Sequence, residues 1–199
     1  MQQELINWIS TSGRLLGSLF YYEPGTQRIR AILAYLRRIN WQAEWIGLKT
    51  PQEITALLIQ QDNLSEQYQA LFIGPQALPA PPWGSVYLDR ESVIFGDSLL
   101  RLRAFMHQHQ IEFRRTIDEP EDHIGLMLML AAYIAEHHSD LLSEYLSRHL
   151  LIWAKRYLQL LSVQTLSPFY RGLALLTQQT LQYWQDEALL IVPQVKFYR

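Results

Sequence analysis

Apolar residues recur every three or four positions along most of the chain, a period that predicts amphipathic α-helices. Residues 5–20 form the first such pattern, which ends at the turn-forming sequence EPGT. A second pattern covers residues 26–40. Thr50 is followed by Pro51 and Glu53, and this spacing is typical of a capping box at a helix start. The sequence therefore predicts three helices before residue 60.

The helical period stops after a shorter predicted helix over residues 65–72. Residues 73–89, IGPQALPAPPWGSVYLD, hold four of the nine prolines. Because each proline fixes φ and removes a backbone donor, we expect turns and polyproline-like backbone here. An irregular connection of this length inside a compact domain is usually functional. This segment is therefore a candidate part of the site.

Helical patterns return over residues 97–110, 120–138 and 139–161, the last with an interruption, and a final helix starts at Ser167 and Pro168. The second of these contains the run 124–135, which is apolar all round and therefore predicted to be the central buried helix. No alternating strand pattern of useful length occurs. We expect an all-α bundle in which residues 1–199 form a single domain with one long proline-rich loop.

The composition narrows the class of protein. With 49% apolar and 18% charged residues, the chain has enough apolar surface to fold. A net charge of −2 gives no general attraction to nucleic acid. The absence of cysteine excludes disulfides and zinc–thiolate sites and fits a cytoplasmic protein. The longest apolar run, residues 124–135, is shorter than the roughly 20 residues that span a bilayer, so no membrane span is expected.

Four carboxylates, Asp118, Glu119, Glu121 and Asp122, precede this apolar run. One interpretation is helix capping: Pro120 would occupy the first helical position. Glu121 and Asp122 would then complement the helix dipole by about 0.3–1 kcal/mol each. This interpretation leaves the other two acids unexplained.

A second interpretation is a binding site. At helical spacing, the side chains of Glu119, Asp122, His123 and Leu126 lie on a common face. Carboxylates at one end and apolar groups beyond them suit a ligand with a basic head and an apolar body. Sequence spacing alone leaves both interpretations open.

A third alternative is a small hydrolase that uses Asp122 and His123 as a carboxylate–imidazole pair. Adjacent helical residues point about 100° apart, however, and no nucleophile motif accompanies them. The other histidines lack the spacing of a zinc pair, and no glycine-rich phosphate motif is present. We expect no catalytic residue, no metal site and no cofactor.

Trp83 lies in the proline-rich sequence PAPPWGS. It can close the edge of the core, or it can act as a rigid aromatic anchor for a partner, a residue type enriched at binding hot spots. Both roles remain open at this point.

Three sequence stretches resemble the TorD/DmsD family, and in particular its DmsD branch. They are LFIGPQALPAPPWGSVYLDRESVIFGD (71–97), EPEDHIGLMLMLAAYIAE (119–136) and SPFYRGL (167–173). The resemblance implies an all-helical cytoplasmic chaperone and not an enzyme. Such a chaperone binds the twin-arginine leader of a molybdoenzyme catalytic subunit, in the DmsD branch that of dimethyl sulfoxide reductase, before export by the twin-arginine translocase (Tat).

The resemblance also implies leader-binding positions. They carry over onto Leu71, Pro82, Trp83, Gly96, Glu119, Pro120, Asp122 and His123. Close relatives often have tryptophan where this chain has Tyr68 and Gln76, so we expect a less aromatic pocket that includes Tyr68. Some members of the wider family exchange helices to form dimers or bind guanine nucleotide weakly; we expect a monomer here, with a helix-swapped dimer as the alternative.

The implied ligand accounts for the acidic and apolar pattern. Leader arginines can pair with Glu119 and Asp122 by charge-assisted hydrogen bonds. The apolar stretch of the leader needs a groove, which we expect Leu71, Trp83 and Leu126 to line. The alternatives are the hydrolase and a generic helical scaffold whose acids only cap a helix.

Overall fold

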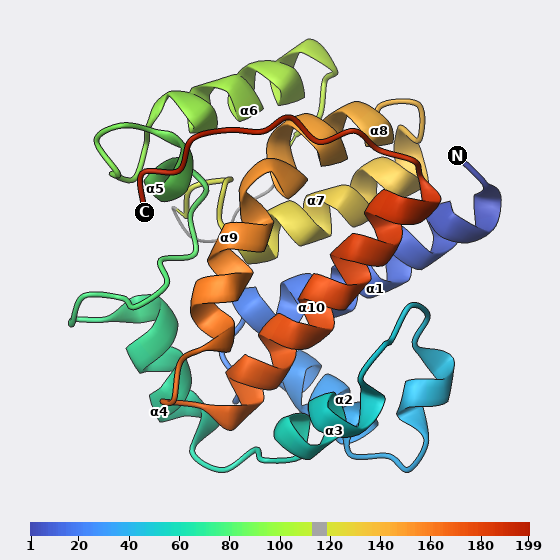
Figure 1. The fold of residues 1–199 in the computed structure, drawn as a ribbon, viewed down its shortest axis with the longest axis vertical. Helices are drawn as coiled ribbons and strands as arrows, with labels where there is room; N and C mark the ends of the chain where they lie inside the picture. The colour runs from blue at the N-terminus through green and yellow to red at the C-terminus, as the bar shows by residue number, and fades with distance from the viewer. Residues whose placement is uncertain (113–118) are drawn as a thin grey trace.

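The computed structural model describes residues 1–112 and 119–199, and the regular elements in these ranges are all helical (Figure 1). The prediction of an all-α fold is confirmed. The α-helices are α1 (Gln3–Tyr21), α2 (Gln27–Leu36), α3 (Pro51–Leu58), α4 (Leu64–Tyr68), α5 (Ser85–Leu88), α6 (Asp97–Gln108), α7 (Ile124–His137), α8 (Leu142–Tyr145), α9 (Leu151–Ser162) and α10 (Pro168–Glu187). A 3₁₀ turn covers Trp41–Glu44, and π-helical turns cover Gln69–Ile73 and Leu146–Leu150.

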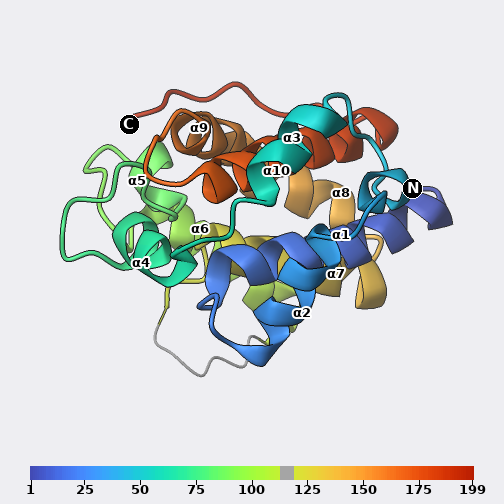
Figure 2. The same ribbon diagram turned by 90° about the horizontal axis from the view of Figure 1, so that it is seen from below.

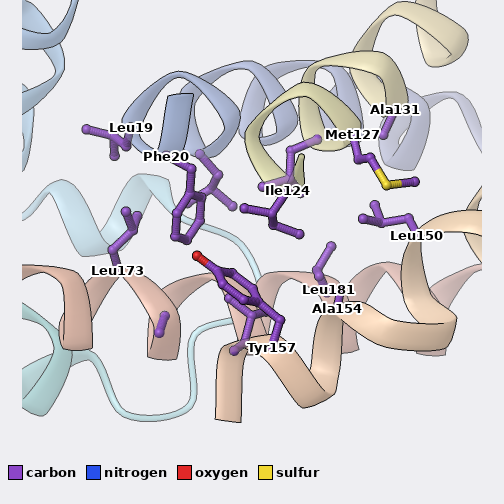
Figure 3. Close-up of a cluster of buried hydrophobic side chains, with 14 of the residues drawn as sticks. Leu19, Phe20, Ile124, Met127, Ala131, Leu150, Ala154, Tyr157, Leu173 and Leu181 are labelled. Atoms are coloured by element: carbon purple, nitrogen blue, oxygen red, sulfur yellow. The ribbon is translucent and has the colours of Figure 1, made fainter. Parts of the chain in front are cut away.

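Two helix pairs face each other across the core. Figure 2 shows α1 beside α7 and, above them, α9 beside α10 with α3 against α10. Side chains from both layers meet between them, as Figure 3 shows for Phe20, Ile124, Tyr157 and Leu173. All four side chains are at most 1% exposed. Burial of such large apolar groups, about 1.5–3 kcal/mol each, holds the layers together.

Helices α1 and α7 pack unusually closely because glycines lie at their contact. A Cβ atom at Gly17 would come 2.6 Å from the carbonyl oxygen of Gly125, and one at Gly125 would come 2.8 Å from the carbonyl oxygen of Gly17. Ten of the fourteen residues of α7 are buried. The prediction that residues 124–135 form the central buried helix is therefore confirmed.

Two local predictions are wrong. Thr50 precedes α3 as expected, but its side chain makes no capping hydrogen bond. Gln179 of α10 binds the backbone just before the helix instead: its Oε1 accepts from Lys49 N at 2.6 Å and from Thr50 N at 3.3 Å. The proline-rich segment is also less irregular than expected, because it contains the short helix α5.

No helix among residues 1–112 and 119–199 is both long and apolar enough to cross a membrane.

Candidate functional site

The proline-rich loop is fastened to the start of α7. Ile124 N donates to Pro82 O at 2.7 Å, and Gly84 N donates to Asp122 O at 3.1 Å. These two hydrogen bonds frame an isolated antiparallel bridge between Trp83 and His123. Residues far apart in the sequence are thus held side by side by their backbones.

The bridge places the side chain of Trp83 against Glu119. Trp83 Nε1 donates to Glu119 Oε1 at 2.5 Å, and both side chains are partly exposed. Desolvation raises the pKa of the Glu119 carboxyl; the hydrogen bond from Trp83 opposes this rise, and the charge of Asp122 adds to it. The predicted proximity of Trp83 to residues 119–123 is confirmed.

Two tyrosines at the end of α1 extend this aromatic surface. The ring of His123 lies 6.3 Å from that of Trp83 and 5.6 Å from that of Tyr21, and Tyr21 is 4.9 Å from Tyr22. Tyr68, from α4, donates its hydroxyl to the carbonyl oxygen of Tyr21 at 2.6 Å. Neither Tyr21 nor Tyr22 is among the site residues predicted from the sequence; their only signal there is an aromatic pair followed by an acid where the first helix ends.

Asp122 has a structural partner. Its Oδ2 accepts from Ser85 N at 2.7 Å and so caps α5, and its side chain is buried. Burial raises the pKa of Asp122, while its hydrogen bonds with Ser85 lower it. Asp122 therefore ties the loop that carries Trp83 to the segment that carries Glu119.

The expected capping of the central helix by acids is wrong. Helix α7 begins at Ile124, four residues later than predicted, and its N-cap is His123. Buried Glu121 instead pairs with Arg103 of α6, with Nε and Nη2 at 2.9 and 2.8 Å from Oε2. Asp118 lies outside the described residues. Because residues 119–123 are not helical, the predicted common helical face is not formed either.

His123 is buried and neutral. Its Nδ1 accepts from Gly125 N at 3.1 Å, and burial lowers its pKa to about 3. Asp122 Oδ2 thus accepts from Ser85 N, and His123 Nδ1 accepts from Gly125 N. Because these two atoms have different partners, the structure does not favour a catalytic carboxylate–imidazole pair. The histidine serves α7 as an N-cap.

The buried state of His123 predicts a pH-dependent stability. The unfolded histidine binds a proton below about pH 6.5, whereas the folded one stays neutral down to about pH 3, so acid favours unfolding. We expect the free energy of unfolding to fall by about 1.4 kcal/mol per pH unit in this window from His123 alone. Urea denaturation of the wild type and of His123→Asn between pH 6.5 and 5 checks this.

Asn is a good N-cap that does not titrate, so the variant should lose less stability over this range. Burial also lowers the pKa of His149, to about 4, and the slope that it adds is common to both proteins. If the free energy of unfolding falls equally with pH in the wild type and in His123→Asn, His123 is not held neutral in the folded protein.

The remaining predicted site residues lie mostly beneath the surface. Leu71 is 1% exposed and Leu126 is 3% exposed, and Pro82 and Pro120 are buried. Among the described residues, the open apolar groove expected between Leu71, Trp83 and Leu126 is therefore not present, because both leucine side chains are buried. Trp83, Tyr21 and Tyr22 are the partly exposed apolar groups at this place.

Gly96 is the N-cap residue of α6, and a Cβ there would collide with the carboxylate of Asp89. Both carboxylate oxygens of Asp89 accept from Ser98 N at 3.1 Å. Glycine is thus needed for Asp89 to cap α6.

The described residues contain no group of three or more histidine, aspartate or glutamate side chains that could hold a metal ion.

Comparisons with known proteins give a consistent result. Residues 43–159 match the family model described as nitrate reductase delta subunit. The chain is 55% identical to the "Probable Tat proofreading chaperone DmsD" of Haemophilus influenzae over 99% of this chain and 100% of that protein. It is 42% identical to the "Tat proofreading chaperone DmsD" of Salmonella typhimurium over 92% of this chain and 91% of that protein. A crystal structure of a candidate redox enzyme maturation protein from Archaeoglobus fulgidus has a similar fold, with a TM-score of 0.53 at 23% identity over 81% of this chain and 89% of that one.

Proposed function

The chain belongs to the nitrate reductase delta subunit family and, within it, to the TorD/DmsD chaperones, and on this premise we propose that it binds the twin-arginine leader of a molybdoenzyme precursor before Tat export. The relatives are named as chaperones, which favours this role over the hydrolase. We infer that the client is a reductase of the dimethyl sulfoxide reductase type and that binding takes place in the cytoplasm, with residues 1–199 acting as one domain.

One observation supports the proposal most directly: a partly exposed tryptophan lies against a partly exposed carboxylate. Trp83 offers an apolar face, and Glu119 offers an acceptor at 2.5 Å from the indole nitrogen. A guanidinium can pair with the carboxylate and also stack on the aromatic face. Tyr21 and Tyr22 continue the aromatic surface, so apolar residues that follow the arginines have further groups to contact.

Magnitudes indicate which groups dominate. An exposed ion pair contributes roughly 0–1 kcal/mol, whereas a fully buried large apolar side chain contributes about 1.5–3 kcal/mol. Micromolar affinity requires about 8 kcal/mol after the costs of association. The apolar part of the leader must therefore supply most of the affinity, while Glu119 sets the register of the arginines. Contacts with Leu71 and Leu126 would require these buried side chains to become accessible.

Titration calorimetry with a leader peptide tests the proposal. The peptide contains two arginines followed by an apolar stretch, and its matched control has both arginines replaced by alanine. We expect saturable binding of the first peptide and weaker binding of the second. Equal affinities, or no binding of either peptide, would remove the proposed function.

Glu119→Gln should reduce the salt dependence of leader binding, because the carboxylate charge is lost while Oε1 can still accept from Trp83. We expect an affinity loss of up to about fivefold at low salt, the range of one exposed ion pair. Calorimetry at several salt concentrations measures the slope.

Asp122→Asn is the matched control. It also removes one negative charge, but at a buried side chain that caps α5, and the asparagine oxygen can still accept from Ser85 N. Its salt slope should stay near that of the wild type. A slope that falls in Asp122→Asn and not in Glu119→Gln would assign the arginine contact to Asp122 instead.

A further inference from the structure

Residues 189–199 form an extended segment that crosses the molecule after α10. Figure 1 shows it in dark red, running past α9 towards α5. It is tied down at both ends. Leu190 N donates to Gln185 O at 3.0 Å, and at the other end Tyr198 N donates to Tyr87 O at 3.0 Å. Arg199 adds two contacts there: its carbonyl oxygen accepts from Arg156 Nε at 3.0 Å, and its Nη2 donates to Leu78 O at 2.8 Å.

Between these ties, residues 191–197, here called the strap, form no hydrogen bond with the described part of the chain through their backbone groups. Apart from the nitrogen of Pro193, each residue of the strap has a free N–H and C=O. Extended backbone with unpaired groups of this kind is what a peptide strand needs in order to add to it.

A groove of about 700 Å³ lies between the strap, α9 and α10. Its apolar lining comes from both sides, with Leu158 and Leu181 on the helices and Val192, Val195 and Phe197 on the strap. Leu158 and Leu181 are at most 4% exposed and form its floor, while Val195 and Phe197 are each 38% exposed. The groove can therefore accept apolar side chains of an incoming segment.

The polar lining of the groove is basic. Lys49, Lys155 and Arg156 line it, and none of the described lining residues is acidic. No ion pair joins these three side chains to an acid among the described residues. Six glutamines complete the lining: Gln159, Gln178, Gln179, Gln182, Gln185 and Gln194. The side chains of Gln179, Gln182 and Gln185 already form hydrogen bonds within the chain. Gln159, Gln178 and Gln194 form none with the described residues, and because primary amides both donate and accept, these three suit the main chain of a peptide.

We propose that this groove binds an extended acidic segment of a partner protein, which lies along the strap and inserts its apolar side chains between α9 and α10. The basic side chains select carboxylates on the incoming segment. A twin-arginine leader has the wrong charge for this groove, and none of the groove-lining residues belongs to the Trp83–Glu119 site. The proposal is therefore of a second partner site, independent of leader binding.

The strap sets the length of the segment: seven residues of extended chain span at most about 23–25 Å. A suitable probe is a fluorescent peptide of roughly seven residues in which Glu and Val alternate, a length that matches this span. Its matched control has every Glu replaced by Gln. Fluorescence anisotropy with the full chain should show saturable, salt-dependent binding of the acidic peptide and clearly weaker binding of the Gln peptide.

Lys155→Glu is the decisive variant, because Lys155 is exposed at the groove. Arg30→Glu makes the same change of charge at an exposed position of α2. We expect Lys155→Glu to lower the affinity for the acidic peptide by at least about fivefold, and Arg30→Glu to lower it by less than about twofold, given the size of exposed ion pairs. Leader affinity in both variants should equal that of the wild type, which separates this site from the proposed leader site.

Several outcomes would overturn the proposal. The acidic peptide could fail to show saturable binding, or Lys155→Glu and Arg30→Glu could weaken its binding equally. The third such outcome is displacement of the acidic peptide by the twin-arginine peptide. Sedimentation velocity tests whether a second copy of the chain occupies the groove instead. If the chain forms a concentration-dependent dimer that Lys155→Glu dissociates, and the acidic peptide does not bind, this face is a contact between two copies of the chain.

Discussion

Gly125→Val is expected to lower the free energy of unfolding by about 2–3 kcal/mol, the upper part of the usual cost of overpacking a core. A Cβ at this position would lie 2.8 Å from the carbonyl oxygen of Gly17, 2.8 Å from Tyr21 Cβ and 3.0 Å from Tyr21 N. Two of these three atoms belong to the backbone of α1, so the steric clash with the new side chain can be relieved only if α1 and α7 move apart. Urea denaturation at constant pH measures the loss.

Gly25→Val is the matched control. A Cβ at Gly25 would meet only the flexible carboxylate of Glu23, at 3.8 Å. This surface substitution should change the free energy of unfolding by less than about 1 kcal/mol. If the two variants are destabilised equally, the close contact between α1 and α7 does not contribute to stability as inferred.

The close contact between α1 and α7 links the stability of the fold to the geometry of the candidate site. Tyr21 ends α1 directly above Gly125, and its ring lies 5.6 Å from that of His123. A shift of α1 away from α7 therefore moves an aromatic group of the candidate site. Helix packing, and not only the loop, determines where the aromatic surface lies.

Helical periodicity predicted most elements because it reports which face of each segment is buried. The central helix was predicted from its apolar run alone, and the interruption within residues 139–161 corresponds to the π-helical turn Leu146–Leu150. The proximity of Trp83 to Glu119 was expected from the family resemblance, and the backbone bridge accounts for it physically.

Long-range hydrogen bonds account for the predictions that are wrong. The start of α7 at Ile124 depends on the acceptor that Pro82 provides for its N–H, and the end of the proline-rich loop becomes helical because Asp122 caps α5. Likewise, the backbone that leads into α3 is held by Gln179, which accepts from Lys49 N and Thr50 N. These partners lie between 37 and 130 positions apart along the chain, so local sequence rules could not indicate them.

Trp83→Ala is expected to weaken leader binding by at least about 1–2 kcal/mol, or roughly 5–30-fold, as for a central aromatic anchor. The substitution removes the largest partly exposed apolar group beside Glu119 and leaves the backbone bridge to His123 in place. Calorimetry with the twin-arginine peptide measures the loss, and circular dichroism confirms the helical fold.

Trp83→Phe separates the two contributions of the indole. Phenylalanine keeps an aromatic face but cannot donate to Glu119 Oε1, so it isolates the hydrogen bond. If apolar contact dominates, as the magnitudes of burial and exposed charge indicate, this variant should retain most of the affinity. If both variants bind the leader as tightly as the wild type while remaining folded, Trp83 only closes the edge of the core. The leader must then be recognised elsewhere on the molecule.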